Sequence, residues 1–284
     1  MNEDTMVRLG STEDAYILRR GEAETRRLIG QARFHNPFTR RLLEEAALKE
    51  GMRVLDVGSG AGDVALLAAE LVGPRGGVMG VDQNPAILEV ARKRARKASL
   101  ANVTFLESDL LDFSEHGEDC FDAVVGRFVL QHLPDPMEAL RSLVRRVRPG
   151  GIVAFQEMNL RPESLQVYPP TPLWQRYWGW SQALLRVGVE SQMGYKLHRT
   201  YLGAGLPAPK MQLEAPVGGG PEWGGYEYAA ETLRSLLPLV LKLGIATEQE
   251  VEIDTLSERL RQETAAAGGV VKMPEVVSAW ALKP

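Results

Sequence analysis

The chain has 284 residues, of which 44% are hydrophobic and 25% charged, the balance of an ordinary globular protein. Its net charge of −4 argues against nucleic acid as the main partner, because binding to phosphates needs a basic face. The single cysteine, Cys120, excludes an internal disulfide and a cysteine metal cluster, and fits a reducing compartment.

The N-terminal residues lack the basic and then apolar run of a signal peptide, and no apolar stretch is long enough to span a bilayer. We therefore expect a cytoplasmic protein with no membrane partner. Residues 13–48 have the pattern of two amphipathic helices separated at Asn36-Pro37, because a residue before proline is pushed out of helical geometry. Residues 1–50 form the expected N-terminal helical cap.

The next segment, residues 51–158, alternates strands with helices. Short apolar runs predict strands at 52–58, 77–82, 103–108, 121–129 and 151–158. Amphipathic runs predict helices at 62–72, 85–99 and 136–148, the last ended by Pro149-Gly150. This α/β alternation predicts a parallel sheet with helices on both faces, and a ligand site beyond the carboxyl ends of the strands. The basic run 92–97 indicates a solvated helix face.

After residue 158 the alternation ends. Residues 159–200 are rich in proline and aromatic residues and predict a lid made of a loop and one or two helices. A helix at 196–206, a sixth strand at 209–217 and a last strand within 270–284 return the chain to the core. We expect residues 201–284 to complete the core, with a helical insertion at about 218–268.

Three glycines, Gly58, Gly60 and Gly62, follow the first strand and open a helix. Their spacing is G-x-G-x-G, so Asp63 stands where a dinucleotide site has its third glycine, and no Lys-Ser/Thr of a P-loop follows. Asp56 and Asp63 would repel a pyrophosphate but suit a ligand with positive charge and no phosphate. S-adenosylmethionine is such a ligand, since its ammonium can pair with an aspartate and its carboxylate with the helix N-terminus.

Two further acids end neighbouring strands. Asp82 ends the second strand and can accept both ribose hydroxyls, which is equally true of dinucleotide sites. Asp109 follows the third strand and can accept a hydrogen bond from an adenine amine. The fourth strand leads into "GRFVLQHLPDP", which would run beneath the methionine part and the methyl group.

Taken together, "VLDVGSGAGD", "GVDQNP", "ESDLLDF" and "GRFVLQHLPDPMEALRSLVRRVRPGG" resemble the class I S-adenosylmethionine-dependent methyltransferases over residues 52–158. The "RFVLQHLPDP" form is similar to the subgroup that methylates small molecules in quinone and natural-product pathways. The Asn/Asp-Pro-Pro-Tyr/Phe motif of amino-group methyltransferases acting on macromolecules is absent. The resemblance implies a Rossmann-like, seven-stranded, mostly parallel sheet whose last strand is antiparallel.

The resemblance also implies which residues line the S-adenosylmethionine site, with S-adenosylhomocysteine as product. The motifs and their flanks give Asp56, Gly58, Ser59, Gly60, Asp63, Asp82, Gln83, Ser108, Asp109, Leu110, Arg127 and Phe128. The N-terminal helices resemble those that close over the cofactor in some bacterial members, which adds Tyr16 and Gln31 at the methionine end.

The lid supplies the expected acceptor site. Trp174, Tyr177 and Trp178 can sandwich a planar substrate or attract a cation, with Glu190, Tyr195 and His198 as polar partners; the alternative is that the aromatic residues only form the underside of the lid. The catalytic candidates are His132, Glu157, Tyr177 and His198. For His132 and Glu157 a bracing role in the loop and the lid is the alternative. The four histidines lack ligand spacing, so no metal is expected.

The predicted function is methyl transfer to a small, aromatic or indole-like acceptor by in-line displacement, with alignment and exclusion of water under the lid as the main sources of rate. Oxygen, nitrogen and carbon acceptors all stay open, as does a homo-oligomer. The alternatives are a non-catalytic, cofactor-binding regulatory module and an NAD(P)-dependent oxidoreductase.

Overall fold

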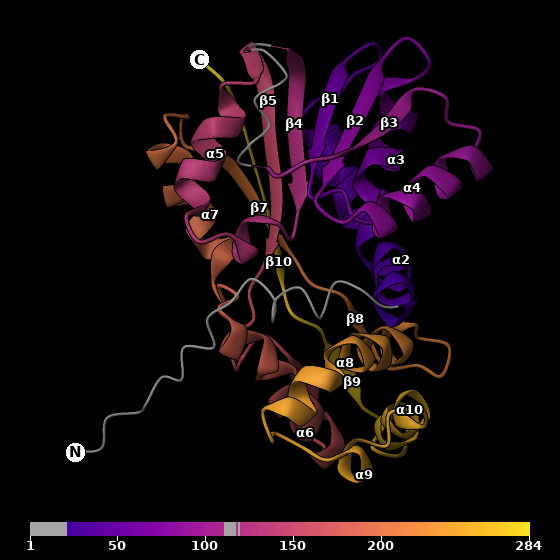
Figure 1. Cartoon of the computed structure of the whole chain (residues 1–284). Coiled ribbons are helices and arrows are strands. Elements are labelled where there is room, and N and C mark those ends of the chain that lie inside the picture. Colours follow the sequence, from indigo (N-terminus) through magenta and orange to yellow (C-terminus); the bar gives the residue numbers. More distant parts are fainter. Residues whose placement is uncertain (1–21, 111–117, 119) are drawn as a thin grey trace.

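A seven-stranded sheet forms the centre of the upper part of the molecule in Figure 1. The computed structural model describes residues 22–110, 118 and 120–284. The strand order is β3-β2-β1-β4-β5-β10-β7, and β10 is antiparallel to both β5 and β7. The strands of this sheet are β1 (Arg53–Val57), β2 (Gly77–Asp82), β3 (Val103–Glu107), β4 (Phe121–Arg127), β5 (Val147–Met158), β7 (Lys210–Glu214) and β10 (Val276–Leu282). The predicted fold class is therefore confirmed, with the last strand inside the sheet and β7 at its edge.

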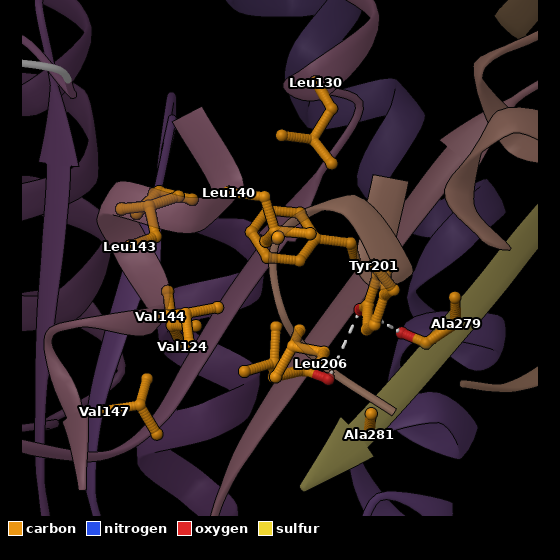
Figure 2. Close-up of a cluster of buried hydrophobic side chains, with 14 of the residues drawn as sticks. Val124, Leu130, Leu140, Leu143, Val144, Val147, Tyr201, Leu206, Ala279 and Ala281 are labelled. Atoms are coloured by element: carbon orange, nitrogen blue, oxygen red, sulfur yellow. Dashed lines mark hydrogen bonds between the residues drawn. The ribbon is translucent and has the colours of Figure 1, made fainter. Parts of the chain in front are cut away.

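Helices cover both faces of this sheet. They are α2 (Glu22–Glu45), α3 (Asp63–Val72), α4 (Pro85–Lys97), α5 (Pro136–Val144) and α7 (Met193–Gly203). Side chains of α2 and α3 pack with strands β1, β4 and β5 on one face. On the other face, α5 and α7 enclose the cluster of Figure 2, where the buried Tyr201 hydroxyl donates to the carbonyl of Ala279 at 2.7 Å. Both faces are dry, as a parallel sheet requires.

The N-terminal helix α2 runs without a break through Pro37, contrary to the predicted separation at that residue. An internal proline costs a helix about 3 kcal/mol. The buried positions Ala32, His35, Thr39 and Leu43 recur every three or four residues on both sides of the proline, however, and Pro37 itself is exposed. Packing of this continuous face against the core outweighs the local penalty.

The second half of the chain departs further from the prediction. Residues 160–187 and 217–272, here called the insert lobe, form one unit below the sheet in Figure 1. A small sheet of order β6-β9-β8 joins the two segments, and neither it nor its pairing was predicted. The lobe contains β6 (Gln166–Tyr168), α6 (Pro172–Ser181), the 3-10 helix η2 (Gln182–Val187), β8 (Val217–Gly218), α8 (Gly225–Lys242), α9 (Glu248–Val251), α10 (Leu256–Ala266) and β9 (Val270–Lys272).

The insert lobe lies over the carboxyl ends of β4 and β5, because the chain leaves β5 directly into the lobe and returns from it into β10. Helix α2 packs against α8, so the N-terminal helix also closes this side. By contrast α7, part of which the predicted boundary at residue 200 assigned to the lid, packs on β5 and β10 in the core. Among the described helices, none is long and apolar enough to cross a membrane.

The core of the insert lobe gives a first prediction. Trp174 is fully buried there, and its indole nitrogen donates to the Thr264 hydroxyl at 2.8 Å. Trp174→Ala should lower the free energy of unfolding by about 3–5 kcal/mol, because it leaves a large cavity and an unpaired hydroxyl. Urea unfolding measures this. Leu202→Ala, at a half-exposed position on α7, should change the free energy of unfolding by less than about 0.5 kcal/mol. Equal losses in the two variants would contradict the assignment of Trp174 to the core of the insert lobe.

Candidate functional site

The glycine turn between β1 and α3 is built for close approach of a ligand to the backbone. Gly58, Gly60 and Gly62 have φ angles of +61°, +51° and +84°, the region that glycine adopts without strain. A Cβ on Gly58 would lie 2.6 Å from Val129 Cγ2, and one on Gly62 2.9 Å from Phe105 Cζ. Neither position accepts a side chain, so the turn presents bare amides at the start of α3.

Asp56 lies directly before this turn at the carboxyl end of β1, with an exposed fraction of 1%. Neither carboxylate oxygen accepts a hydrogen bond of normal geometry within the described part of the chain. The backbone amide of Ala65 lies close enough to favour the charged form of Asp56. Burial raises the pKa of Asp56 well above its usual range, and the Arg127 guanidinium opposes that shift. A buried carboxylate without donors is costly, so this oxygen pair fits a cationic or hydrogen-donating ligand group.

Asp82 ends β2 and connects two backbone segments. Its Oδ2 accepts the Gly60 amide and its Oδ1 the Asn84 amide, both at 2.9 Å. Each oxygen retains a second lone-pair direction for a ligand hydroxyl. The carboxylate thus fixes the glycine turn and retains acceptor capacity at the carboxyl end of β2.

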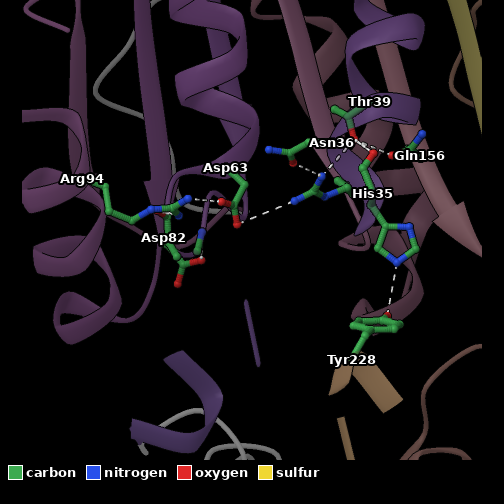
Figure 3. Close-up of polar contacts among 11 residues, drawn as sticks. His35, Asn36, Thr39, Asp63, Asp82, Arg94, Gln156 and Tyr228 are labelled. Atoms are coloured by element: carbon green, nitrogen blue, oxygen red, sulfur yellow. Dashed lines mark hydrogen bonds and ion pairs between the residues drawn. The ribbon is translucent and has the colours of Figure 1, made fainter. Parts of the chain in front are cut away.

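A chain of charges crosses the site from α4 to α2 (Figure 3). Asp63 forms an ion pair with Arg94 at 2.5 Å and lies 3.7 Å from the guanidinium of Arg127. Its carboxylate therefore pairs with two cations in the structure. Arg94 also donates to the Ala61 carbonyl at 2.6 Å, so this member of the basic run 92–97 faces the glycine turn and not solvent.

Arg127, the last residue of β4, anchors the N-terminal helix. Its Nη1 donates to Asn36 Oδ1 at 3.0 Å and to Thr39 Oγ1 at 2.9 Å. Thr39 donates in turn to Gln156 Oε1 at 2.8 Å, inside β5. Burial lowers the pKa of Arg127, while the nearby Asp63 and Asp56 raise it. α2 is therefore held to the strand ends by a buried cation.

Glu157 in β5 has an exposed fraction of 0% and accepts the amides of Val129, Leu130 and Gln131 at 3.0, 2.8 and 3.3 Å. Burial raises the pKa of Glu157 to about 8. The carboxyl group thus supports the turn after β4, η1 (Leu130–His132), and its hydrogen bonds go to this loop and not to the lid. His132 is exposed at the end of this turn, with Nε2 3.2 Å from Gln131 Nε2.

The lid aromatics separate into two groups. Trp174 and Tyr177 are buried in the insert core, with exposed fractions of 0% and 3%, so the structure gives them a packing role in place of an open stacking surface. Trp178 is half-buried and donates from its indole nitrogen to the Pro162 carbonyl at 2.9 Å. Its side chain packs against the buried cluster of Met158, Leu160 and Val276 at the carboxyl end of β5.

The apolar side chains around Met158, Leu160 and Val276, here called the apolar edge cluster, adjoin the polar site. Phe128 directly follows Arg127 and adopts φ +58°, which is unusual for a bulky residue and typical of functional sites. Its ring meets the buried imidazole of His35 edge-on at 5.1 Å. The members of the apolar edge cluster are Phe128, Met158, Leu160, Trp178, Leu184, Leu185, Val189 and Val276.

The remaining predicted site residues lie at the rim or elsewhere. Gln31 is buried on α2; Ser59 is buried in the glycine turn; Gln83 follows β2; Ser108, Asp109 and Leu110 follow β3. Glu190 forms a salt bridge with Lys196, which lowers its pKa, and Tyr195 is half-exposed beside Glu275. His198 lies on the exposed side of α7, so the structure does not bring it to the site. Tyr16 lies outside the described residues.

Several residues at the site were not predicted. His35 lies inside an amphipathic helix and has no motif around it, yet it is 1% exposed and its Nε2 lies 3.2 Å from the Tyr228 hydroxyl of α8. A sequence signal existed for Gln156, since a glutamine within an apolar strand needs a partner. Thr39 lies on the buried face of α2, and its spacing is that of an ordinary core position, so the sequence gives no signal for a role at the site.

Comparison with known proteins identifies similar sequences and folds. Residues 48–183 match the family described as "Methyltransferase domain". A 2-phytyl-1,4-naphtoquinone methyltransferase of Synechococcus elongatus is 39% identical over 131 residues, 46% of this chain and 55% of that protein. An aklanonic acid methyltransferase, DauC, of a Streptomyces species is 35% identical over 142 residues, 49% of this chain and 64% of that protein. The chain spans about half the length of the curated relatives it matches.

Among solved structures, the YcgJ protein from Bacillus subtilis superposes with a TM-score of 0.57 at 17% identity, over 88% of this chain and 99% of that chain. At this identity the match supports the fold alone. The family resemblance carried by the four motifs is confirmed, and the segment 217–272 of the insert lobe lies beyond the matched residues.

The raised pKa of Glu157 predicts a pH-dependent stability. Between its unfolded value of about 4.5 and its folded value of about 8, the folded protein retains a proton that the unfolded chain has released. The contribution of this carboxyl is therefore full below the unfolded pKa and is lost as pH rises through the folded pKa. Glu157→Gln removes the titration, so the stability advantage of the wild type over the variant should shrink with rising pH.

Urea unfolding of both proteins at about pH 5 and about pH 8.5 measures this difference. The exposed Glu248→Gln serves as the matched control, whose stability should follow that of the wild type at both pH values. A constant gap between the wild type and Glu157→Gln would show that Glu157 keeps the same charge in the folded and unfolded states.

Proposed function

We propose that this protein transfers a methyl group from S-adenosylmethionine to a small, apolar acceptor with an aromatic ring, a proposal that the match of residues 48–183 to a methyltransferase domain supports. The single observation that carries the cofactor assignment is the buried carboxylate of Asp56, which has no hydrogen-bond partner of normal geometry in the described part of the chain and adjoins a turn of three positive-φ glycines. A group that combines positive charge with hydrogen-bond donors satisfies that carboxylate.

The remaining cofactor contacts follow from the strand ends. The carboxylate of Asp82 is placed to accept ribose hydroxyls, and the amides of the glycine turn with the start of α3 suit the amino-acid carboxylate. Ser108 to Leu110, after β3, adjoin the position of the adenine. The acids Asp56 and Asp82 at the ends of β1 and β2 disfavour the pyrophosphate of NAD(P).

The acceptor site is proposed at the apolar edge cluster. It lies between the strand ends proposed for the cofactor and the insert lobe, and it offers the partly exposed rings of Phe128 and Trp178, which pack on the buried Met158 and Val276. Such a surface stabilises an apolar, planar molecule by area burial and ring contacts. The names of the similar proteins, which include a naphtoquinone and an aklanonic acid methyltransferase, accord with a ring-containing acceptor.

When bound, S-adenosylmethionine supplies a methyl group on a sulfonium, an already activated leaving group. The chain's part is then to align and to exclude water. Glu157 fixes the turn after β4 through three amides, which holds Phe128 and Leu130 at the reaction side of the cofactor. α2 and the insert lobe cover this edge, with α2 fastened by Arg127.

The function is tested by incubating the full chain with methyl-labelled S-adenosylmethionine and a panel of phenols, naphthohydroquinones and indoles, and by mass spectrometry for products with one added methyl group. Calorimetric titrations with S-adenosylhomocysteine and with NADPH accompany it. Binding of S-adenosylhomocysteine, together with formation of a methylated product from the panel, supports the proposal. Tight binding without turnover on any acceptor favours a regulatory module, and binding of NADPH alone favours an oxidoreductase.

The ribose contact predicts a defined loss of affinity. Asp82→Asn should weaken S-adenosylhomocysteine binding by about 10- to 100-fold, since hydrogen bonds to a charged group are worth about 1.5–3 kcal/mol. Isothermal calorimetry measures it. Asp122→Asn is the matched control, because Asp122 pairs with Arg148 at the opposite end of β4 and should leave the affinity unchanged. An unaltered affinity in Asp82→Asn contradicts the ribose assignment.

The apolar edge cluster predicts a separation between cofactor and acceptor binding. Trp178→Ala removes the largest ring of the cluster and should raise the acceptor KM by about tenfold or more, in line with about 1.5–3 kcal/mol for a buried apolar side chain. The affinity for S-adenosylhomocysteine should stay at the wild-type value. Steady-state kinetics and calorimetry check the two parts; a parallel loss of both would place Trp178 in the cofactor site.

A further inference from the structure

The strand β7 forms one edge of the seven-stranded sheet (Figure 1). Its inner side pairs with β10 in antiparallel register from Lys210 to Glu214, and no strand in the described part of the chain pairs with its outer side. The outer side of an edge strand presents a row of backbone N–H and C=O groups, which can pair with a further strand. The edge is therefore able to bind an extended segment of another molecule.

One face of β7 exposes large apolar side chains. Met211 and Leu213 have exposed fractions of 38% and 53%. They lie opposite Ala279 and Val277 of β10, so both are on the face of the sheet that carries α7. At the other edge of the sheet, by contrast, the apolar residues of β3 are all partly buried. Apolar side chains beside the backbone groups of an edge are the surface that pairing with a further strand would cover.

The other face of β7 carries opposite charges at its two ends. Lys210 begins the strand and Glu214 ends it, with Gln212 midway between them. Natural proteins often protect an edge strand with charged residues, and such protection against a second copy depends on like charges that meet. Here opposite charges meet when a second copy runs in the opposite direction, because Lys210 of each copy then lies beside Glu214 of the other.

Two-fold symmetry about Gln212 matches both faces of the strand. Residues directly opposite each other in an antiparallel pair lie on the same face of the sheet. An axis through Gln212 places Lys210 of one copy opposite Glu214 of the second copy. The same axis places Met211 of one copy opposite Leu213 of the second, so that apolar side chains meet apolar side chains.

The prolines that flank β7 disfavour the neighbouring registers. Pro209 directly precedes the strand and Pro216 follows it by two residues, and proline has no N–H for a ladder. An axis at Leu213 would put Lys210 opposite Pro216. An axis at Met211 would put Leu213 opposite Pro209. Both shifts also separate the charge pairs, so the axis at Gln212 is the one that pairs the strand over its whole length.

Glu214 has room for a second cation. Its Oε1 accepts a hydrogen bond from Arg41 of α2, whose side chain is half exposed. Burial raises the pKa of Glu214, and the Arg41 guanidinium opposes that shift. The charge of Glu214 is thus incompletely compensated within one chain, and its second oxygen can accept a further hydrogen bond. Lys210 is exposed and can supply that bond to a second copy.

We propose that β7 is a self-association surface, through which two copies of this chain pair antiparallel about a two-fold axis at Gln212 and join their sheets edge to edge. The interface is isologous, since the same strand serves both copies. The insert lobes do not meet, because the Glu214 end of β7 leads into the lobe and the antiparallel partner places its own lobe at the opposite end. This inference does not depend on the proposed methyl transfer.

Sedimentation equilibrium of the full chain tests the association over about 1–100 µM, the range of affinities expected for a small interface. The wild type should approach twice the mass of the chain at the upper end of this range. Leu213→Glu puts a charge on the apolar face and should raise the dissociation constant of the dimer by about tenfold or more. Val270→Glu, at a valine of the insert lobe that is 42% exposed, is the matched control and should sediment as the wild type does.

A charge exchange tests the register. Lys210→Glu and Glu214→Lys each turn two opposite-charge pairs into two like-charge pairs, so either variant alone should dimerise about tenfold more weakly or worse. An equimolar mixture of the two variants should recover the association, since each introduced charge then faces its opposite in the other copy. Circular dichroism checks that each variant is folded. If Glu214→Lys does not fold, the exposed substitutions Lys210→Glu and Leu213→Glu decide the question together.

Three outcomes would overturn the inference. One is a wild type that sediments as a monomer over the whole range. Another is a dimer that persists unweakened in both Leu213→Glu and Lys210→Glu, which would place the interface elsewhere. The third is a mixture of the two folded charge variants that stays as weakly associated as each variant alone, which would exclude the register centred on Gln212.

Discussion

The buried guanidinium of Arg127 is the contact on which the rest of this site depends. Taking a cation out of water is costly unless carboxylates and hydrogen-bond acceptors surround it, and here Asp63, Asn36 and Thr39 do so. Because these partners come from α3 and α2, the side chain at the end of β4 fixes both helices to one strand end. The same charge lies close to Asp56 and limits the cost of burying that carboxylate.

Glu157 has the corresponding role for the loop that follows β4. Three successive amides converge on one carboxyl group, which replaces the missing helical or ladder partners of that turn. Phe128 is thereby held in a left-handed conformation between the polar site and the apolar edge cluster. A strained aromatic residue kept in place by a buried acid is a rigid boundary between the proposed cofactor and acceptor regions.

Much of the core could be predicted from the sequence because its signals are local. Apolar runs, the glycine turn and the acids at the strand ends each lie within a few residues of one another, so spacing alone placed Asp56, Gly58 and Asp82. The insert lobe could not be predicted in the same way. Its strands are two or three residues long, and Gln166 pairs with Lys272 across more than a hundred residues of chain. The contact between His35 and Tyr228 joins residues 193 positions apart in the chain, so no local pattern predicts it.

The sheet divides its strand ends between two tasks. β1, β2 and β3 end in the acids and glycines proposed for the cofactor, whereas β5, β10 and β7, adjacent in the sheet, lead into or out of the insert lobe. Only two residues separate β7 from β8 and three separate β9 from β10, so the lobe is tethered along one side. Exchange of this lobe for another would therefore alter the proposed acceptor side and leave the strand ends proposed for the cofactor unchanged.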